Sequence, residues 1–371
     1  MTRRVLPSRP QAQNFLLLAV VLLFLLGVSE LVLRKLYPEA PKPQAAAGWA
    51  IIPESSWIEY DATLGWTHQR NTSSSLKKNG QTVPVSLNSK GYRGTREYAD
   101  YKKPGSFRIL AAGDSFTFGF GVHDNETFPA QMEALDPSLE VLNLGVAGYG
   151  VDQIYLSAQR ELSETHPDLV LISVYPEDFW RATRAFNDAG YGKPYFSLKD
   201  GALELRHVPV PRDKNFSTVQ FPDLIGKSPL EKFLMNSALY RVTLKAMIRL
   251  QKMLGLEDPD SSPEWVLGRV ILSHMVHDLK RAGVPAVLVI VPPQRWLTGT
   301  VEPVRDSMLR FANREGIDAV DLTPVFQKAF AEKPAAHWYI TDDLHWTAAG
   351  NRLVAQTLVD YLKNKSLLKA S

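Results

Sequence analysis

The residues best suited to chemistry are Ser115, Asp342 and His345. Ser115 lies in "ILAAGDSFTFGFGV" (109–122), where an apolar run stops at a glycine-flanked turn. A serine hydroxyl becomes a nucleophile when an imidazole accepts its proton, and an acid on the other ring nitrogen orients that imidazole. In "YITDDLHWTAAGN", Asp342 and His345 are three residues apart, so one turn directs both side chains the same way. We predict Ser115 as nucleophile, His345 as base and Asp342 as orienting acid.

Attack on a carbonyl also requires hydrogen-bond donors for the oxyanion that develops. The stretch "NLGVAGYG" (143–150) contains Gly145, Gly148 and Gly150. Such glycines let the backbone approach a bound atom and aim N–H groups at it. We predict the N–H groups of Ser115 and Gly148 as two donors, each worth on the order of 100- to 1000-fold in rate.

These residues must be positioned by buried strands and by the helices between them. Short, nearly all-apolar runs typical of parallel strands occur at 107–112, 139–145, 168–174, 285–291 and 317–322. Helical patterns lie at about 126–135, 151–165, 263–282, 302–315 and 347–364. The alternation predicts a three-layer α/β/α sandwich, in which sites form at the carboxyl ends of the strands.

One interval, 175–262, is longer than a single crossover helix. It contains a predicted hairpin turning at Asp200-Gly201 and a long amphipathic helix within 229–254. Such an insertion at the site end of a sheet is either a lid or specificity region, or extra packing or an interaction surface. A second hairpin is predicted at Asn79-Gly80.

The N-terminus predicts a membrane anchor. Between residues 15 and 33 the only ionisable residue is Glu30, with arginines before the run and Arg34 and Lys35 after it. No small-residue cleavage site follows directly, and the basic residues place the N-terminus inside. We therefore expect a tail (1–13), a transmembrane signal-anchor (14–35), a linker and N-terminal extension (36–104), and a catalytic domain (105–371) on the periplasmic or extracellular side.

Composition excludes several classes of function. The net charge of +3 is spread without basic blocks, which argues against a nucleic-acid partner. The chain has no cysteine, so thiol nucleophiles, thiolate zinc sites and iron–sulfur clusters are excluded. Asp342, Asp343 and His345 lack a second histidine at ligand spacing, since His337 is distant. We predict neither a metal nor a cofactor.

The three stretches "GDSFTFGFGV", "NLGVAGYG" and "DDLHWTAAG" resemble, in order, the blocks of the SGNH, or GDSL-like, esterase and acylhydrolase superfamily. The resemblance covers about 105–364. It implies a flavodoxin-like five-stranded sheet, with Ser115, Asp342 and His345 as the triad, Gly148 as an oxyanion donor and Asp114 as a structural residue. The family's third block carries an asparagine whose amide is a further donor, whereas here "YPED" places Glu177.

Glu177 is the departure that matters, because an ionised glutamate donates no hydrogen bond. Either Glu177 is displaced and another group donates, the candidates being Gln294 and Arg295 after the fourth predicted strand, or Glu177 is protonated, or catalysis is weakened. Substrate contacts are predicted for Gln294, Arg295 and the rim tryptophans Trp180, Trp296 and Trp346; Trp338 belongs to the same group of rim tryptophans. These rings pack the core in the alternative interpretation.

The preferred function is a membrane-anchored serine esterase acting on acyl esters, acetyl esters first, of an envelope or secreted polysaccharide. One alternative is a polysaccharide O-acyltransferase that uses the same triad and passes the acyl group to a sugar hydroxyl. The other is a catalytically impaired scaffold that binds a glycan or a protein partner. Glu177 is the reason to consider the scaffold, and the intact predicted triad argues against it.

Overall fold

The computed structural model describes residues 9–36, 57–78, 81–187, 190–199, 201–212, 234, 236–253, 259–299 and 301–368. The chain forms two compact units, one of residues 1–44 with 227–258 and the other of residues 45–226 with 259–371. The predicted chemical residues all belong to the second unit. Residues 37–56 of the expected linker lie outside the described residues.

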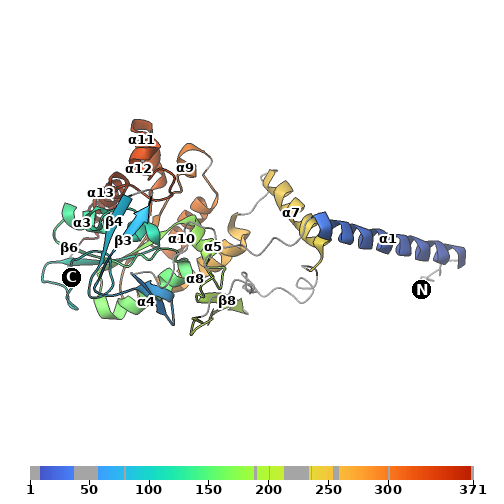
Figure 1. Cartoon of the computed structure of the whole chain (residues 1–371), viewed down its shortest axis with the longest axis horizontal. Coiled ribbons are helices and arrows are strands. Elements are labelled where there is room, and N and C mark those ends of the chain that lie inside the picture. Colours follow the sequence, from blue (N-terminus) through green and yellow to red (C-terminus); the bar gives the residue numbers. More distant parts are fainter. Residues whose placement is uncertain are drawn as a thin grey trace. The chain divides into compact units, whose positions relative to one another are not determined.

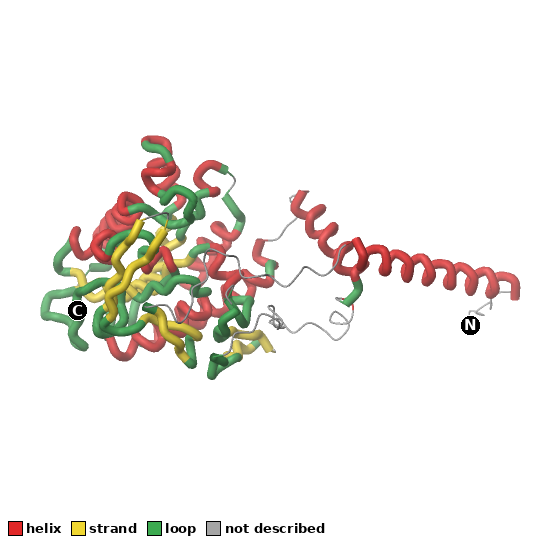
Figure 2. Tube along the Cα trace, in the orientation of Figure 1, coloured by secondary structure: helices red, strands yellow, loops and turns green. Residues whose placement is uncertain are grey.

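The centre of the second unit is a five-stranded parallel sheet in the order β11-β10-β7-β5-β6. In chain order this is 2-1-3-4-5, the flavodoxin-like arrangement that the family resemblance implies. Figures 1 and 2 show these strands enclosed by helices. The strands are β5 (Phe107–Ala112), β6 (Leu139–Asn143), β7 (Leu169–Val174), β10 (Ala286–Ile290) and β11 (Asp318–Asp321).

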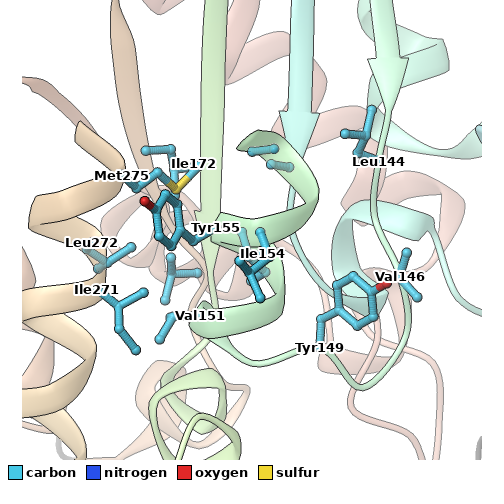
Figure 3. Packing of buried hydrophobic residues seen from close by; sticks show 14 of the residues in the cluster. Leu144, Val146, Tyr149, Val151, Ile154, Tyr155, Ile172, Ile271, Leu272 and Met275 are labelled. Atoms are coloured by element: carbon cyan, nitrogen blue, oxygen red, sulfur yellow. The ribbon is translucent and has the colours of Figure 1, made fainter. Parts of the chain in front are cut away.

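Helices cover both faces of this sheet because successive side chains of each strand point to opposite sides. Leu110 packs in a core with α4 (Val151–Thr165), α8 (Pro263–Arg281) and α10 (Val304–Glu315). Its neighbour Ile109 packs in a second core with α3 (Phe128–Leu135), α11 (Thr323–Glu332) and α13 (Ala348–Asn364). Figure 3 shows the first core, where Ile154 and Tyr155 of α4 face Ile271, Leu272 and Met275 of α8. The three-layer prediction is confirmed.

Shorter elements surround the sheet. The strands of both predicted hairpins pair, since Lys78 lies opposite Gln81 and Lys199 opposite Ala202, whereas the turn residues 79, 80 and 200 lie outside the described residues. A further antiparallel pair begins at Ile58, inside the segment expected to be linker. The strands are β1 (Ile58–Asp61), β2 (Gly65–His68), β3 (Thr72–Lys78), β4 (Gln81–Leu87), β8 (Tyr195–Lys199) and β9 (Ala202–Arg206). The short helices are α2 (Ser115–Phe118), η1 (Asp124–Glu126), α5 (Pro176–Arg181), η2 (Pro259–Ser261), α9 (Arg295–Thr298) and α12 (Ala335–Trp338).

The first unit joins α1 (Arg9–Leu36) to α7 (Ala238–Met253), which lies within the predicted insertion. The Glu30 carboxylate accepts hydrogen bonds from the N–H groups of Ala238 and Leu239, each at 2.8 Å, and so caps the N-terminus of α7. Within the described residues, no helix combines the length and the apolar character needed to cross a membrane.

Candidate active site

Ser115 is the first residue of α2 and follows the carboxyl end of β5. Asp114 caps this helix, because its Oδ1 accepts a hydrogen bond from the N–H of Phe116 at 2.9 Å. Gly113 is required before it, since a Cβ there would lie 2.1 Å from Oγ1 of Thr117. The tight turn holds the Ser115 side chain at the rim of the sheet, where only 6% of the residue is exposed.

The structure brings Ser115 and His345 together across 230 residues of sequence. Nε2 of His345 lies 2.7 Å from Oγ of Ser115, and Nδ1 lies 2.7 Å from Oδ1 of Asp343. In the tautomer with its proton on Nδ1, His345 donates a hydrogen bond to the Asp343 carboxylate, and its unprotonated Nε2 accepts a hydrogen bond from the Ser115 hydroxyl. The aromatic rings of Phe116 and Phe120 each have their centroid 5.0 Å from that of the imidazole and restrict its movement.

Asp343, rather than Asp342, contacts the imidazole, so the predicted orienting residue is corrected. The expectation assumed a helical turn, whereas residues 340–345 form a loop closed by a bridge between Tyr339 and Trp346. Asp342 sits in this loop with a positive φ of 59° and is exposed. Asp343 is buried, and its Oδ1 also accepts from the N–H groups of Leu344 and His345. The only sequence signal for it was the adjacent aspartate pair.

The glycine-rich loop after β6 packs against the serine turn, where the N–H of Val146 donates to the carbonyl of Gly113 at 3.2 Å. Asn143 fixes the start of the loop, because its Oδ1 accepts from the N–H of Gly145 at 3.0 Å. Gly145 packs directly on α2, where an added Cβ would lie 2.1 Å from the backbone nitrogen of Phe118. Gly148 has a φ of 81°, a conformation that favours glycine. Among the described residues, the N–H groups of Ser115 and Gly148 donate to no other protein group.

Glu177 begins the short helix after β7 and is held by an ion pair. Its Oε1 lies 3.1 Å from Nη1 of Arg295, whose Nε also donates to Glu302 at 2.7 Å. The Arg295 side chain is 48% exposed, and burial lowers its pKa less than these two carboxylates raise it. One guanidinium is therefore shared by two glutamates, and Arg295 is not available as a bare cation.

A buried charge cluster lies beneath the serine turn. Nη1 of Arg181 donates to Oδ2 of Asp114 at 3.0 Å, to Oδ1 of Asp178 at 2.6 Å and to the carbonyl of Tyr149 at 3.2 Å. Burial, followed by the charge of Asp114, raises the pKa of Asp178 well above its ordinary value, and Arg181 opposes this shift. Burial alone lowers the pKa of Arg181, but the two aspartates outweigh it and raise that pKa. No sequence motif marked Arg181.

The predicted substrate contacts divide by exposure. Trp296 is 0% and Trp346 is 2% exposed, so both indoles pack in the core and the predicted contact with substrate is corrected. Trp338 is partly buried and donates from Nε1 to the carbonyl of Ala329. Trp180 is 39% exposed and the guanidinium of Arg184 stacks on it. Gln294 is half-buried at the start of α9.

The residues around His345 make no recognisable cation site. In the described part of the chain, no three histidine, aspartate or glutamate side chains are grouped so as to hold a metal ion. The arrangement present is a serine hydroxyl in hydrogen-bond contact with an imidazole, whose other ring nitrogen contacts an aspartate. Such an arrangement suits acyl transfer through a covalent intermediate.

A family model described as GDSL-like Lipase/Acylhydrolase family matches residues 111–353. No curated protein matches the sequence.

Solved structures of low identity also match. One is a member of the lipolytic protein G-D-S-L family from Veillonella parvula, with 10% identity, 70% of this chain and 99% of that chain covered, and a TM-score of 0.41. Another is the psychrotrophic esterase EstA from Pseudoalteromonas sp., with 14% identity, 70% and 98% covered, and a TM-score of 0.39. A catalytic mutant of the acetylxylan esterase Axe2 from Geobacillus stearothermophilus has 14% identity, 72% and 97% covered, and a TM-score of 0.40.

The family model spans more than half of the sequence and includes both Ser115 and His345. The chain belongs to the GDSL-like lipase/acylhydrolase family.

Proposed function

We propose that this protein is a serine esterase that cleaves acyl esters through an acyl-enzyme on Ser115. The observation that carries the proposal is the 2.7 Å contact between Oγ of Ser115 and Nε2 of His345, with Asp343 on the other ring nitrogen. A nucleophile, a base and an orienting acid in hydrogen-bond contact are the groups that ester hydrolysis at a serine requires.

In acylation, Oγ of Ser115 attacks the ester carbonyl carbon while its proton passes to Nε2 of His345. The resulting imidazolium is stabilised by the Asp343 carboxylate at Nδ1. The carbonyl oxygen becomes an oxyanion and accepts from the N–H groups of Ser115 and Gly148. When the intermediate collapses, the C–O bond to the alcohol breaks and His345 returns the proton to the leaving oxygen.

In deacylation, water replaces the alcohol. His345 takes a proton from the water, the hydroxide oxygen attacks the acyl carbon, and a second oxyanion occupies the same donors. Collapse breaks the bond to Oγ, returns the proton to Ser115 and releases the carboxylic acid. If a sugar hydroxyl enters in place of water, the same residues carry out acyl transfer instead.

As substrate we propose acetyl or other short acyl esters of a polysaccharide. Support comes from Trp180, whose indole is 39% exposed although the guanidinium of Arg184 stacks on one of its faces, because exposed indole surface of this kind binds sugar rings. Because Trp296 and Trp346 are buried, Trp180 is the one of these three that has a surface for such a ligand. Glu177 and Glu302, which both pair with Arg295, disfavour an anionic leaving group beside Arg295.

We also propose that residues 15–33 attach the chain to a membrane, with its N-terminus inside and the catalytic unit outside. Support comes from the apolar sequence between the flanking basic residues and from exposed side chains such as Leu23 and Phe24. Fractionation of cells that express the full-length chain tests this attachment. Recovery in the salt-washed soluble fraction would contradict it.

The experiment for the function is labelling of the purified full-length protein with a fluorophosphonate, beside turnover of p-nitrophenyl acetate. Ser115→Ala is the test variant and Ser106→Ala, on the exposed loop before β5, is the matched control. We expect the wild type and Ser106→Ala to be labelled and to release p-nitrophenol, and Ser115→Ala to do neither. A folded wild type that gives no reaction would overturn the proposal in favour of a binding scaffold.

Acetylated polysaccharide then separates hydrolysis from transfer. Release of acetate without an added acceptor supports the esterase. An acyl-enzyme that turns over only when a sugar acceptor is present identifies the acyltransferase. Activity confined to long-chain lipid esters would contradict the substrate class.

A further inference from the structure

Arg181 joins three parts of the site that the sequence keeps far apart. Its Nη1 donates to Asp114, which directly precedes the nucleophile, and to the carbonyl of Tyr149, which directly follows Gly148. It also donates to Asp178, which directly follows Glu177. The nucleophile turn, the glycine loop and the start of α5 therefore meet at one nitrogen atom.

The partners of Arg181 are themselves fixed to the backbone. Asp114 uses its other oxygen to cap α2 at the N–H of Phe116, and only 1% of Asp114 is exposed. Asp178 is fully buried, and its Oδ2 accepts from the N–H of Tyr175 at 2.9 Å. Because both carboxylates are held at two points, a movement of Arg181 would be transmitted to the backbone of α2 and of the segment after β7.

The glycine loop is also held close to α5. A Cβ on Gly150 would lie 2.8 Å from the backbone nitrogen of Ala182 and 2.9 Å from the carbonyl oxygen of Asp178. Tyr149 is anchored from its other end, since its hydroxyl donates to the carbonyl of Trp66 at 2.6 Å. The loop that presents Gly148 therefore has close contact with α5 on one side and the β2 strand on the other.

We propose that Arg181 is a positioning residue that sets the distance between the Ser115 and Gly148 N–H groups, and so the geometry of the oxyanion site. This inference rests on the proposed esterase function. Arg181 touches neither the ester nor the imidazole. Its effect is on the donors whose alignment matters in the transition state, where a misplacement of about 1 Å costs on the order of 100-fold in rate.

The expected signature is a fall in kcat with little change in KM. We expect Arg181→Met to lower kcat for p-nitrophenyl acetate about 30- to 100-fold and to change KM by less than about threefold. Arg181→Lys is expected to fall between the wild type and Arg181→Met, because all three hydrogen bonds come from one nitrogen and an ammonium group replaces it one bond short.

A matched control separates positioning from general destabilisation. Arg108 is a buried arginine, bonded to Glu140 and to the carbonyls of Ala99, Asp100 and Thr165, near the opposite end of β5 from Ser115. Arg108→Met is expected to lower Tm as Arg181→Met does, while kcat at 25 °C stays within about twofold of the wild type. Equal loss of kcat in both variants would overturn the proposal.

A double variant separates positioning from charge compensation. Arg181→Met leaves two buried carboxyl groups without their cation, and Asp178→Asn in the same chain removes one of them. The double variant is expected to recover Tm but not kcat, and it replaces Arg181→Met if the single variant does not fold. Recovery of kcat together with Tm would overturn the proposal.

The two hypotheses fail in different ways. If Ser115→Ala retains turnover, the proposed function is wrong. If Ser115→Ala is inactive while Arg181→Met and its double variant keep the kcat of the wild type, the function stands and the positioning role is wrong.

Discussion

Asp343 lies two residues before His345, and its carboxylate holds the imidazole at Nδ1 through a 2.7 Å hydrogen bond. Its neighbour Asp342 is exposed in the same loop. Two adjacent aspartates thus occupy unlike environments, one beside the base and one in solvent.

We expect this difference to separate the two aspartates in activity. Asp343→Asn is expected to lower kcat about 1000-fold, because the amide no longer favours the productive tautomer or stabilises the imidazolium. Asp342→Asn is expected to change kcat by less than about twofold, since water screens its charge. Initial rates with p-nitrophenyl acetate decide the matter, and a larger loss in Asp342→Asn would restore that residue as the orienting acid.

Replacement of Glu177 tests the oxyanion site. Glu177→Asn removes a negative charge and adds an amide donor at the position where the third block of the family carries an asparagine. Because the amide can donate to the oxyanion, we expect kcat to rise about tenfold. Glu302→Gln removes the other carboxylate on Arg295 and serves as the control, with kcat unchanged. A fall in kcat specific to Glu177→Asn would mean that the ion pair with Arg295 supports catalysis.

The contact of Gly145 with α2 predicts a steric effect on the serine turn. In Gly145→Ala the new methyl group would meet the backbone of Thr117 and Phe118, so we expect a loss of about 3 kcal/mol in unfolding free energy and a lower kcat. Gly283→Ala is the control, because Gly283 has a φ of 72° in open space and should cost about 1 kcal/mol from strain alone. Urea unfolding measures both, and equal losses would contradict the close-packing argument.

The stability of the fold should depend on His68. Burial, with a smaller contribution from Arg93, lowers the pKa of His68 to about 4, although its Nδ1 contacts the carbonyl of Gly91. Between pH 6.5 and pH 4 the His68 imidazole is therefore protonated in the unfolded chain and neutral in the folded protein. Stability from this group is complete above pH 6.5 and falls by up to about 3 kcal/mol as the pH drops to 4.

The measurement is urea unfolding at pH 7.0, 5.5 and 4.5 for the wild type and His68→Gln. We expect the wild type to lose more unfolding free energy than His68→Gln over this range. His274→Gln, at an exposed histidine of α8, should follow the wild type. Parallel curves for the wild type and His68→Gln would contradict a neutral, buried His68.

The strands and major helices were predictable because burial on both faces demands continuous apolar runs. The runs at 107–112 and 151–165 coincide with β5 and α4 to the residue. The loop at 340–345 was not predictable in the same way, since the positive φ of Asp342 depends on how the chain closes between Tyr339 and Trp346. Spacing alone favoured Asp342 over Asp343, and only tertiary packing decides between them.

The tryptophans and Arg181 show a second limit. Indole rings serve equally well in a core or on a binding face, so residue type could not separate the buried Trp296 from the exposed Trp180. Arg181 draws its importance from acceptors at residues 114, 149 and 178, which share no sequence spacing. These three acceptors come together only when the folded sheet brings the segments that follow β5, β6 and β7 to the same edge.

The wide separation of Ser115 and His345 along the chain has a consequence for biosynthesis. The serine is translated 230 residues before His345, which lies in the loop that leads into α13. That helix is tied to the early part of the chain, where the N–H of Phe128 donates to Asn351. On the proposed mechanism, a nascent polypeptide that has not yet reached residue 345 carries an inert serine, and reactivity begins only after the loop of residues 340–345 has been made and has folded against the serine turn.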